Sequence, residues 1–182
     1  MRRSIEEAEQ RKAGQFQMNV IRVILGSFAS SCVALVFLVT SVHAKEYDYA
    51  ISYCGSGTTT LVSQTDEITI FSYDMKGITW STHPTDKAFD KSTYHCVGIV
   101  RTGRGGLANH GYCKYMEPDG DFVTGEYTAT GPEGRWQFLE GTGKYNDIKG
   151  GGPNQPFVSG KAIVPGTSQG CRRATGKYTL PD

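Results

Sequence analysis

Hydrophobic and polar residues alternate with a period of two through most of the chain after Ala44. The pattern is clearest over residues 47–53 and 68–75, where aromatic or aliphatic side chains take every second position. Strict alternation of this kind predicts half-buried β-strands, and helical periodicity is nearly absent. Further strand candidates, chosen by the same pattern, are residues 78–81, 93–102, 107–116, 121–130, 134–141, 157–164 and 171–180.

Residues that form turns separate these candidate strands. The breakers are rich in glycine and proline and are found at residues 103–106, 118–120, 131–134, 150–153 and 165–166. Connections this short favour antiparallel pairing of neighbouring strands. Residues 82–92 form the one sizeable polar loop, with room for a single short helical turn.

This strand pattern allows two architectures, a closed antiparallel barrel and a two-sheet β-sandwich. Glycines also occur inside the candidate strands, for example Gly98, Gly111 and Gly125. Glycines within strands commonly mark the bulges or sharp coiling that closure of a barrel requires. We therefore predict an all-β fold, an antiparallel closed β-barrel of about eight strands, with the two-sheet β-sandwich as the alternative.

An apolar segment precedes the strands. Residues 23–42 carry no charge, Arg22 comes before them, and Val42-His43-Ala44 follows. A basic flank, an apolar core and a small-residue exit predict a helical secretory signal peptide. The alternative is an uncleaved membrane anchor formed by residues 23–42, because about 20 apolar residues can span a bilayer.

The leader sets the expected domain organisation and compartment. Residues 1–44 are predicted to be the signal peptide, with translation starting at Met1 or at Met18, and residues 45–182 to be a single disulfide-bonded β-barrel domain. The predicted location is secreted or periplasmic, and the membrane is a partner only if the leader stays uncleaved. A formal net charge of +1 gives no basic excess for phosphate binding, so we expect no nucleic-acid partner.

The spacing of two cysteines predicts a bridged hairpin. If Arg104-Gly105 is a two-residue turn, Gly103 faces Gly106, and counting outward places Cys96 opposite Cys113. That pair is non-hydrogen-bonded, the class in which side chains approach most closely, and its Cα separation suits a disulfide. The sequence therefore predicts a Cys96–Cys113 bridge.

The remaining cysteines after Ala44 are then left to pair. Cys54 follows the first candidate strand and Cys171 begins the last, so a Cys54–Cys171 bridge would join the two strands that barrel closure brings together. An even number of cysteines is expected of an exported protein. The chain has no CxxC or HxxxH spacing, and we expect no metal site and no cofactor.

Residues 136–150, WQFLEGTGKYNDIKG, form the most distinctive segment of the chain. An aromatic strand runs into Gly-Thr-Gly, then an aromatic residue and a closing glycine, and this resembles the strand–turn–strand of the allene oxide cyclase and dirigent barrels. The resemblance implies an eight-stranded antiparallel barrel with an apolar cavity, usually trimeric and exported or plastid-targeted.

Glu140 is the strongest catalytic candidate in the sequence. If residues 134–141 form one regular strand, Glu140 shares a face with Trp136 and Phe138, and an inward face would hold this carboxylate among aromatic rings. Such a group is suited to general acid–base chemistry, because burial favours the neutral acid. The alternative is that Glu140, next to Gly141 at the strand end, reaches solvent.

Aromatic residues are the candidates for lining a ligand pocket, since barrel interiors commonly hold small molecules. The alternative is that they pack into a solid core. The candidates are Phe71, Trp80, Tyr127, Trp136 and Phe138.

Three functions remain open. The first is an exported, non-catalytic binding or structural module, with a small apolar molecule as its candidate ligand. The second is a cofactor-independent cyclase or isomerase that uses Glu140 in an apolar cavity. The third is a dirigent-like interaction protein that forms homo-oligomers.

Overall fold

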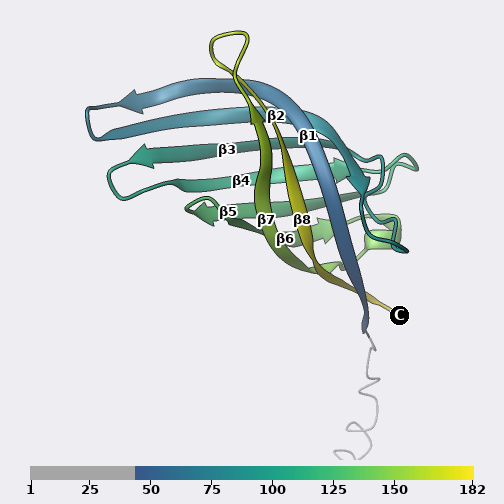
Figure 1. Ribbon diagram of the computed structural model, residues 1–182. Coiled ribbons are helices and arrows are strands. Elements are labelled where there is room, and N and C mark those ends of the chain that lie inside the picture. Colours follow the sequence, from purple (N-terminus) through teal and green to yellow (C-terminus); the bar gives the residue numbers. More distant parts are fainter. Residues whose placement is uncertain (1–43) are drawn as a thin grey trace, which may run out of the picture. The chain divides into compact units, whose positions relative to one another are not determined.

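The barrel is closed and antiparallel, and each strand pairs with its neighbour in sequence while β1 pairs with β8 (Figure 1). The structure is a computed structural model that describes residues 44–182. The closed barrel is thus confirmed and the two-sheet β-sandwich is wrong. The elements are β1 (Ala44–Gln64), β2 (Ile68–Ser81), β3 (Thr93–Gly103), β4 (Ala108–Met116), β5 (Phe122–Thr130), β6 (Gly134–Gly141), the short 3₁₀ turn η2 (Gly143–Tyr145), β7 (Lys149–Gly160) and β8 (Thr167–Pro181).

The predicted leader, residues 1–44 with the apolar run 23–42, lies outside the described residues except for Ala44, where β1 begins. Its helix, its cleavage and the alternative membrane anchor therefore stay predictions. No helix within residues 44–182 is long and apolar enough to cross a membrane.

Both disulfides join the predicted pairs of cysteines. Cys96 of β3 and Cys113 of β4 lie opposite each other, and their Cα atoms are 4.0 Å apart. Cys54 of β1 and Cys171 of β8 also face each other, again with Cα atoms 4.0 Å apart. The second bridge therefore fixes the strand pair that closes the barrel, as predicted.

The prediction for β7 is wrong. Residues 150–153 were expected to form a turn before a strand at 157–164, but the strand runs from Lys149 to Gly160. Gly150 and Gly151 have φ angles of +113° and +151°, which favour glycine. A Cβ atom at Gly151 would also lie 2.0 Å from the carbonyl oxygen of Trp136 on β6. These glycines let three backbones pack closely within the sheet, so here they belong to a strand.

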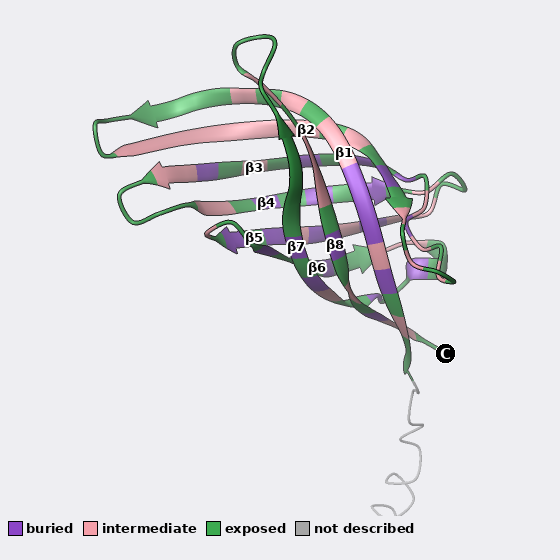
Figure 2. Cartoon of the chain, viewed as in Figure 1, coloured by how far each residue is buried: buried purple, intermediate pink, exposed green. Residues whose placement is uncertain are grey.

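Residues 82–92 close one end of the barrel. The loop contains turns and no helical turn, and it carries Phe89 into the interior, where the side chain is 2% exposed. The Phe89 ring stacks on Phe138 and Tyr145, with centroids 5.5 and 5.3 Å away. Buried residues follow β1 and β5 and reach η2 at this same end (Figure 2). The polar loop is thus a plug with an aromatic tip.

Candidate functional site

The half of the barrel away from Phe89 is hollow. A cavity of about 260 Å³ lies among side chains of the strands, and Val158 of β7 and Gln169 of β8, both solvent-exposed, lie at its rim. These two residues flank the β7–β8 connection, which is at the opposite end from the loop that carries Phe89. The cavity is therefore reached from the β7–β8 side, and the rings of Tyr115 and Trp136 separate it from the end that holds Phe89.

Aromatic rings form the floor of the cavity. Tyr53, Tyr94, Tyr115 and Trp136 contact one another in sequence, with successive ring centroids 5.3, 5.6 and 5.3 Å apart. The Tyr53–Tyr94 and Tyr115–Trp136 contacts are edge-to-face, a favourable geometry for aromatic pairs. Burial raises the pKa of Tyr115 well above its usual value, so this hydroxyl stays neutral. The floor is rigid and uncharged.

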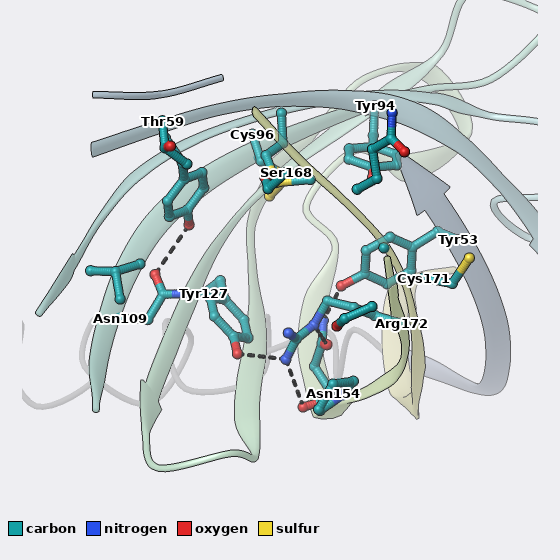
Figure 3. Close-up of a pocket in the computed structure, with 18 of the residues that line it drawn as sticks. Tyr53, Thr59, Tyr94, Cys96, Asn109, Tyr127, Asn154, Ser168, Cys171 and Arg172 are labelled. Carbon is teal, nitrogen blue, oxygen red and sulfur yellow. Dashed lines mark hydrogen bonds between the residues drawn. A yellow bond between two sulfur atoms is a disulfide. The ribbon is translucent and has the colours of Figure 1, made fainter. Parts of the chain in front are cut away.

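Arg172 of β8 brings a positive charge into the cavity. It lies opposite Tyr53 in the β1–β8 pairing, and its Nε donates to Asn154 Oδ1 at 2.6 Å (Figure 3). Its Nη2 donates to the hydroxyl of Tyr127 at 2.8 Å. Asn154, which is 2% exposed, is held in turn because its Nδ2 donates to the Tyr53 hydroxyl at 2.5 Å. The guanidinium is thus fixed in orientation by three strands.

No carboxylate within residues 44–182 forms an ion pair with Arg172. Its charge acts on the surrounding phenols instead. Burial raises the pKa of Tyr53, and the Arg172 charge opposes part of that rise. Burial likewise raises the pKa of Tyr127, again against the effect of Arg172.

A second polar pair lies on another wall. The Tyr73 hydroxyl of β2 donates to Asn109 Oδ1 of β4 at 3.2 Å. Burial raises the pKa of Tyr73 to about 12. Tyr73 reaches Asn109 across Gly98 and Gly111, where an added Cβ would lie 2.4 and 2.3 Å from its hydroxyl oxygen. The two glycines therefore make room for this cavity tyrosine.

Three of the five predicted lining residues, Phe71, Tyr127 and Trp136, lie in the cavity wall. Phe138 packs in the solid half of the barrel against Phe89. Trp80 was expected inside, but it is 38% exposed on the outer face. Its neighbour Thr79 points inward and is buried, so alternation along β2 turns Trp80 outward.

The expectation that Glu140 faces the barrel interior is wrong, and the alternative, that its side chain reaches solvent, holds. Gly125 of β5 pairs with Phe138, whereas Thr124 pairs with Glu140, so Leu139 is an extra residue in β6. This bulge breaks the alternation of side chains, since two residues of one strand oppose one of the other. Trp136 and Phe138 point inward as expected, and Glu140 is exposed. It takes no part in the cavity.

Glu117 is a largely buried carboxylate, with a side chain 9% exposed. It lies in the β4–β5 connection and accepts hydrogen bonds from the Phe89 backbone N–H at 2.7 Å, from the Tyr145 hydroxyl and from the Lys144 ammonium. Burial, and then the Glu117 charge, raise the pKa of Tyr145. Glu117 anchors the plug and lies outside the cavity. Nothing in the period-two pattern distinguished it, because it falls between strands.

Metal binding finds no support in the described part of the chain. Among residues 44–182, no three His, Cys, Asp or Glu side chains come together as a metal site would require. His95 and His110 are instead each beside a carboxylate on exposed side chains, with Nε2 3.1 Å from Asp74 and 2.6 Å from Glu126.

No family model matches the chain, and no curated protein matches it. A solved structure of a pterocarpan synthase dirigent protein is similar, with a TM-score of 0.48 and 9% sequence identity over 77% of this chain and 94% of that chain. The solved protein is of the dirigent kind that residues 136–150 resemble.

Proposed function

We propose that this protein is an exported barrel that binds a small, largely apolar molecule in its cavity. The observation that carries the proposal is the cavity itself, about 260 Å³ of space whose lining includes seven aromatic side chains, in a barrel whose other half is solidly packed. Ligand sites are commonly preformed, mostly apolar hollows with a few placed polar groups. Because typical sites measure about 300–1,000 Å³, this one suits a small ligand.

The cavity wall is built to keep its shape without a ligand. The Cys96–Cys113 bridge lies in the wall and ties β3 to β4. The rings of Tyr53, Tyr94 and Tyr115 support one another at centroid distances of 5.3–6.4 Å. A rigid site loses less conformational entropy when a ligand binds, which favours affinity.

The chemistry of the lining favours binding over catalysis. Among the described residues, the lining contains no aspartate, glutamate or histidine. Burial raises the pKa values of Tyr53, Tyr73 and Tyr94, so these phenols are poor proton acceptors near neutral pH. General acid–base catalysis works best with a group whose pKa lies near the operating pH. Glu140, the carboxylate that could have served, lies outside.

Export is supported by two features. The described domain holds two disulfides, and disulfides persist in oxidising compartments. The sequence before it has the basic, apolar and small-residue order of a signal peptide. The mature chain is then expected to begin at Lys45, in the secreted or periplasmic space. Mass analysis of the exported protein tests this, and an intact membrane-bound chain would contradict it.

The binding test uses a cavity-filling variant and a matched control on the same strand. Val100 lines the cavity, whereas Val97 is 45% exposed on the outer face of β3. Full-length protein from a disulfide-forming host is titrated with the neutral probe 2-naphthalenemethanol by calorimetry. Val100→Phe should weaken binding at least about tenfold by occupying the site, and Val97→Phe should leave it unchanged. Equal affinity in both variants, or no binding by the wild type, would overturn the proposal.

A further inference from the structure

We infer that Arg172 is the anchor for an anionic group, so that the ligand of this cavity is a small carboxylate with an apolar body. The inference rests on the proposed function, since it names the class of molecule that the cavity takes. It begins from a charge that the described part of the barrel leaves uncompensated.

A guanidinium is always charged at physiological pH, and arginine is rarely buried without a partner. Arg172 is half-buried among tyrosine rings and forms no ion pair with any residue of 44–182. In a cavity walled by apolar groups, a carboxylate interacts with such a charge more strongly than it would in bulk water. The site thus offers an anion a favourable interaction that the described chain does not already use.

The hydrogen bonds of Arg172 leave the Nη1 amino group available. Nε is used by Asn154 Oδ1, and Nη2 is used by the Tyr127 hydroxyl and, at 3.5 Å, by the Asn154 carbonyl. Nη1 donates to no residue of the described chain. Because Asn154 and Tyr127 hold the guanidinium plane between them (Figure 3), the free donors are presented in a fixed direction. A charged N–H donor such as Nη1 forms a stronger hydrogen bond to a carboxylate oxygen than a neutral donor does.

Tyr127 adds a neutral donor beside the charge. Its oxygen accepts from Arg172, so its own proton is available to a ligand oxygen. Burial raises the pKa of this phenol, which keeps the proton in place. One carboxylate could therefore accept from both Nη1 of Arg172 and the hydroxyl of Tyr127, while its body lies against the aromatic floor.

The preferred test compares two probes of the same skeleton, 2-naphthoate and 2-naphthalenemethanol, on the full-length protein. The acid should bind the wild type about tenfold more tightly or better, because a hydrogen bond to a charged group adds to the shared apolar contact. In Arg172→Met this preference should disappear, whereas Arg173→Met should keep it. Arg173 is the matched control, since it is exposed on the other face of β8 and stacks on Phe157.

Two further variants separate recognition from folding. Tyr127→Phe removes one hydroxyl and keeps the ring, and it should lower affinity for 2-naphthoate more than for 2-naphthalenemethanol. Arg172→Lys keeps the charge without the planar fork and should keep only part of the preference. Circular dichroism and disulfide mapping show whether each variant is folded, and if Arg172→Met is not, the Tyr127→Phe and Arg172→Lys results decide.

The outcomes distinguish the anion site from the proposed binding function on which it rests. If both probes bind the wild type equally, or if Arg172→Met keeps the preference for the acid, the anion site is wrong and the apolar cavity stands. If neither probe binds, the proposed function and the anion site both fall. A preference for the acid that Arg172→Met abolishes and Arg173→Met retains supports both.

Discussion

The Trp136 indole covers Gly125 of the neighbouring strand, and a Cβ atom at Gly125 would lie 2.1 Å from Cζ2 of the ring. The bare backbone at Gly125 is what allows Trp136 to lie against β5 and leave the cavity open. Trp136 is also the edge of the aromatic floor, in contact with Tyr115. One glycine in a strand therefore sets the shape of the cavity.

Gly125→Ala tests this relationship. The added methyl must displace the ring toward the cavity or strain β5, so we expect a loss of about 1–3 kcal/mol in unfolding free energy and weaker probe binding. Gly160→Ala in β7 is the control, because its Cβ would have no neighbour closer than 3.8 Å. Urea unfolding and calorimetric titration measure the two effects. Equal behaviour of both variants would show that Trp136 does not depend on Gly125.

The two disulfides are expected to contribute unequally to stability. Cys54–Cys171 closes a sequence separation of 117 residues and Cys96–Cys113 one of 17. In the chain-entropy model the long loop contributes about 4–5 kcal/mol and the short one about 3 kcal/mol. Replacing Cys54 and Cys171 together by serine should therefore lower the urea midpoint more than replacing Cys96 and Cys113. The reverse order would show that strain or residual structure, and not loop entropy, governs the bridges.

Phe89 should be among the most costly residues to truncate. Its ring fills the closed end between Phe138 and Tyr145, so Phe89→Ala leaves a cavity that neighbouring rings cannot fill, at a cost of about 3–5 kcal/mol. Phe157→Ala, at a solvent-exposed ring on β7, is the control and should cost much less. Thermal unfolding measures both. A small loss for Phe89→Ala would mean that the barrel end holds without its plug.

Local spacing predicted the parts of this fold that depend on regular geometry. The Arg104-Gly105 turn fixed the register of β3 and β4, and from it the Cys96–Cys113 pair, because antiparallel pairing follows from the turn residue by residue. The prediction that Glu140 faces inward failed because the regular geometry of the strand ends before this residue. One bulge residue, Leu139, ended the alternation, and a period-two pattern carries no mark of such an insertion.

The sequence-based predictions also missed two functional features, the aromatic tip of the plug and the charge in the cavity. Phe89 stands alone in a polar loop, and only the tertiary structure brings it against the rings of Phe138 and Tyr145. Arg172, by contrast, could have been found from the sequence. It shares the inward face of the last strand with Ala174 and Tyr178, and a lone arginine on an apolar face is the signal that was missed.

Alkaline pH should unfold this barrel through its buried tyrosines. Burial raises the pKa values of Tyr49, Tyr94, Tyr115 and Tyr145 above the ordinary value of 10.0, while the unfolded chain releases these protons near that value. Above about pH 10 the unfolded state therefore holds fewer protons than the native state, and the unfolding free energy falls as pH rises. Below about pH 10 these tyrosines are protonated in both states, so they do not change the unfolding free energy with pH.

Tyr94→Phe isolates the contribution of one buried tyrosine to the loss of stability at alkaline pH. The ring stays in the floor, but its titration is gone, so the decline of unfolding free energy between about pH 10 and 12 should be shallower than in the wild type. Phe138→Leu is the control, because it weakens the core without removing a titrating group and should lower the curve by the same amount at every pH. Urea unfolding at a series of pH values measures both slopes. If Tyr94→Phe and the wild type decline in parallel, the Tyr94 hydroxyl ionises as easily in the folded barrel as in the unfolded chain, and the effect of burial on its pKa is wrong.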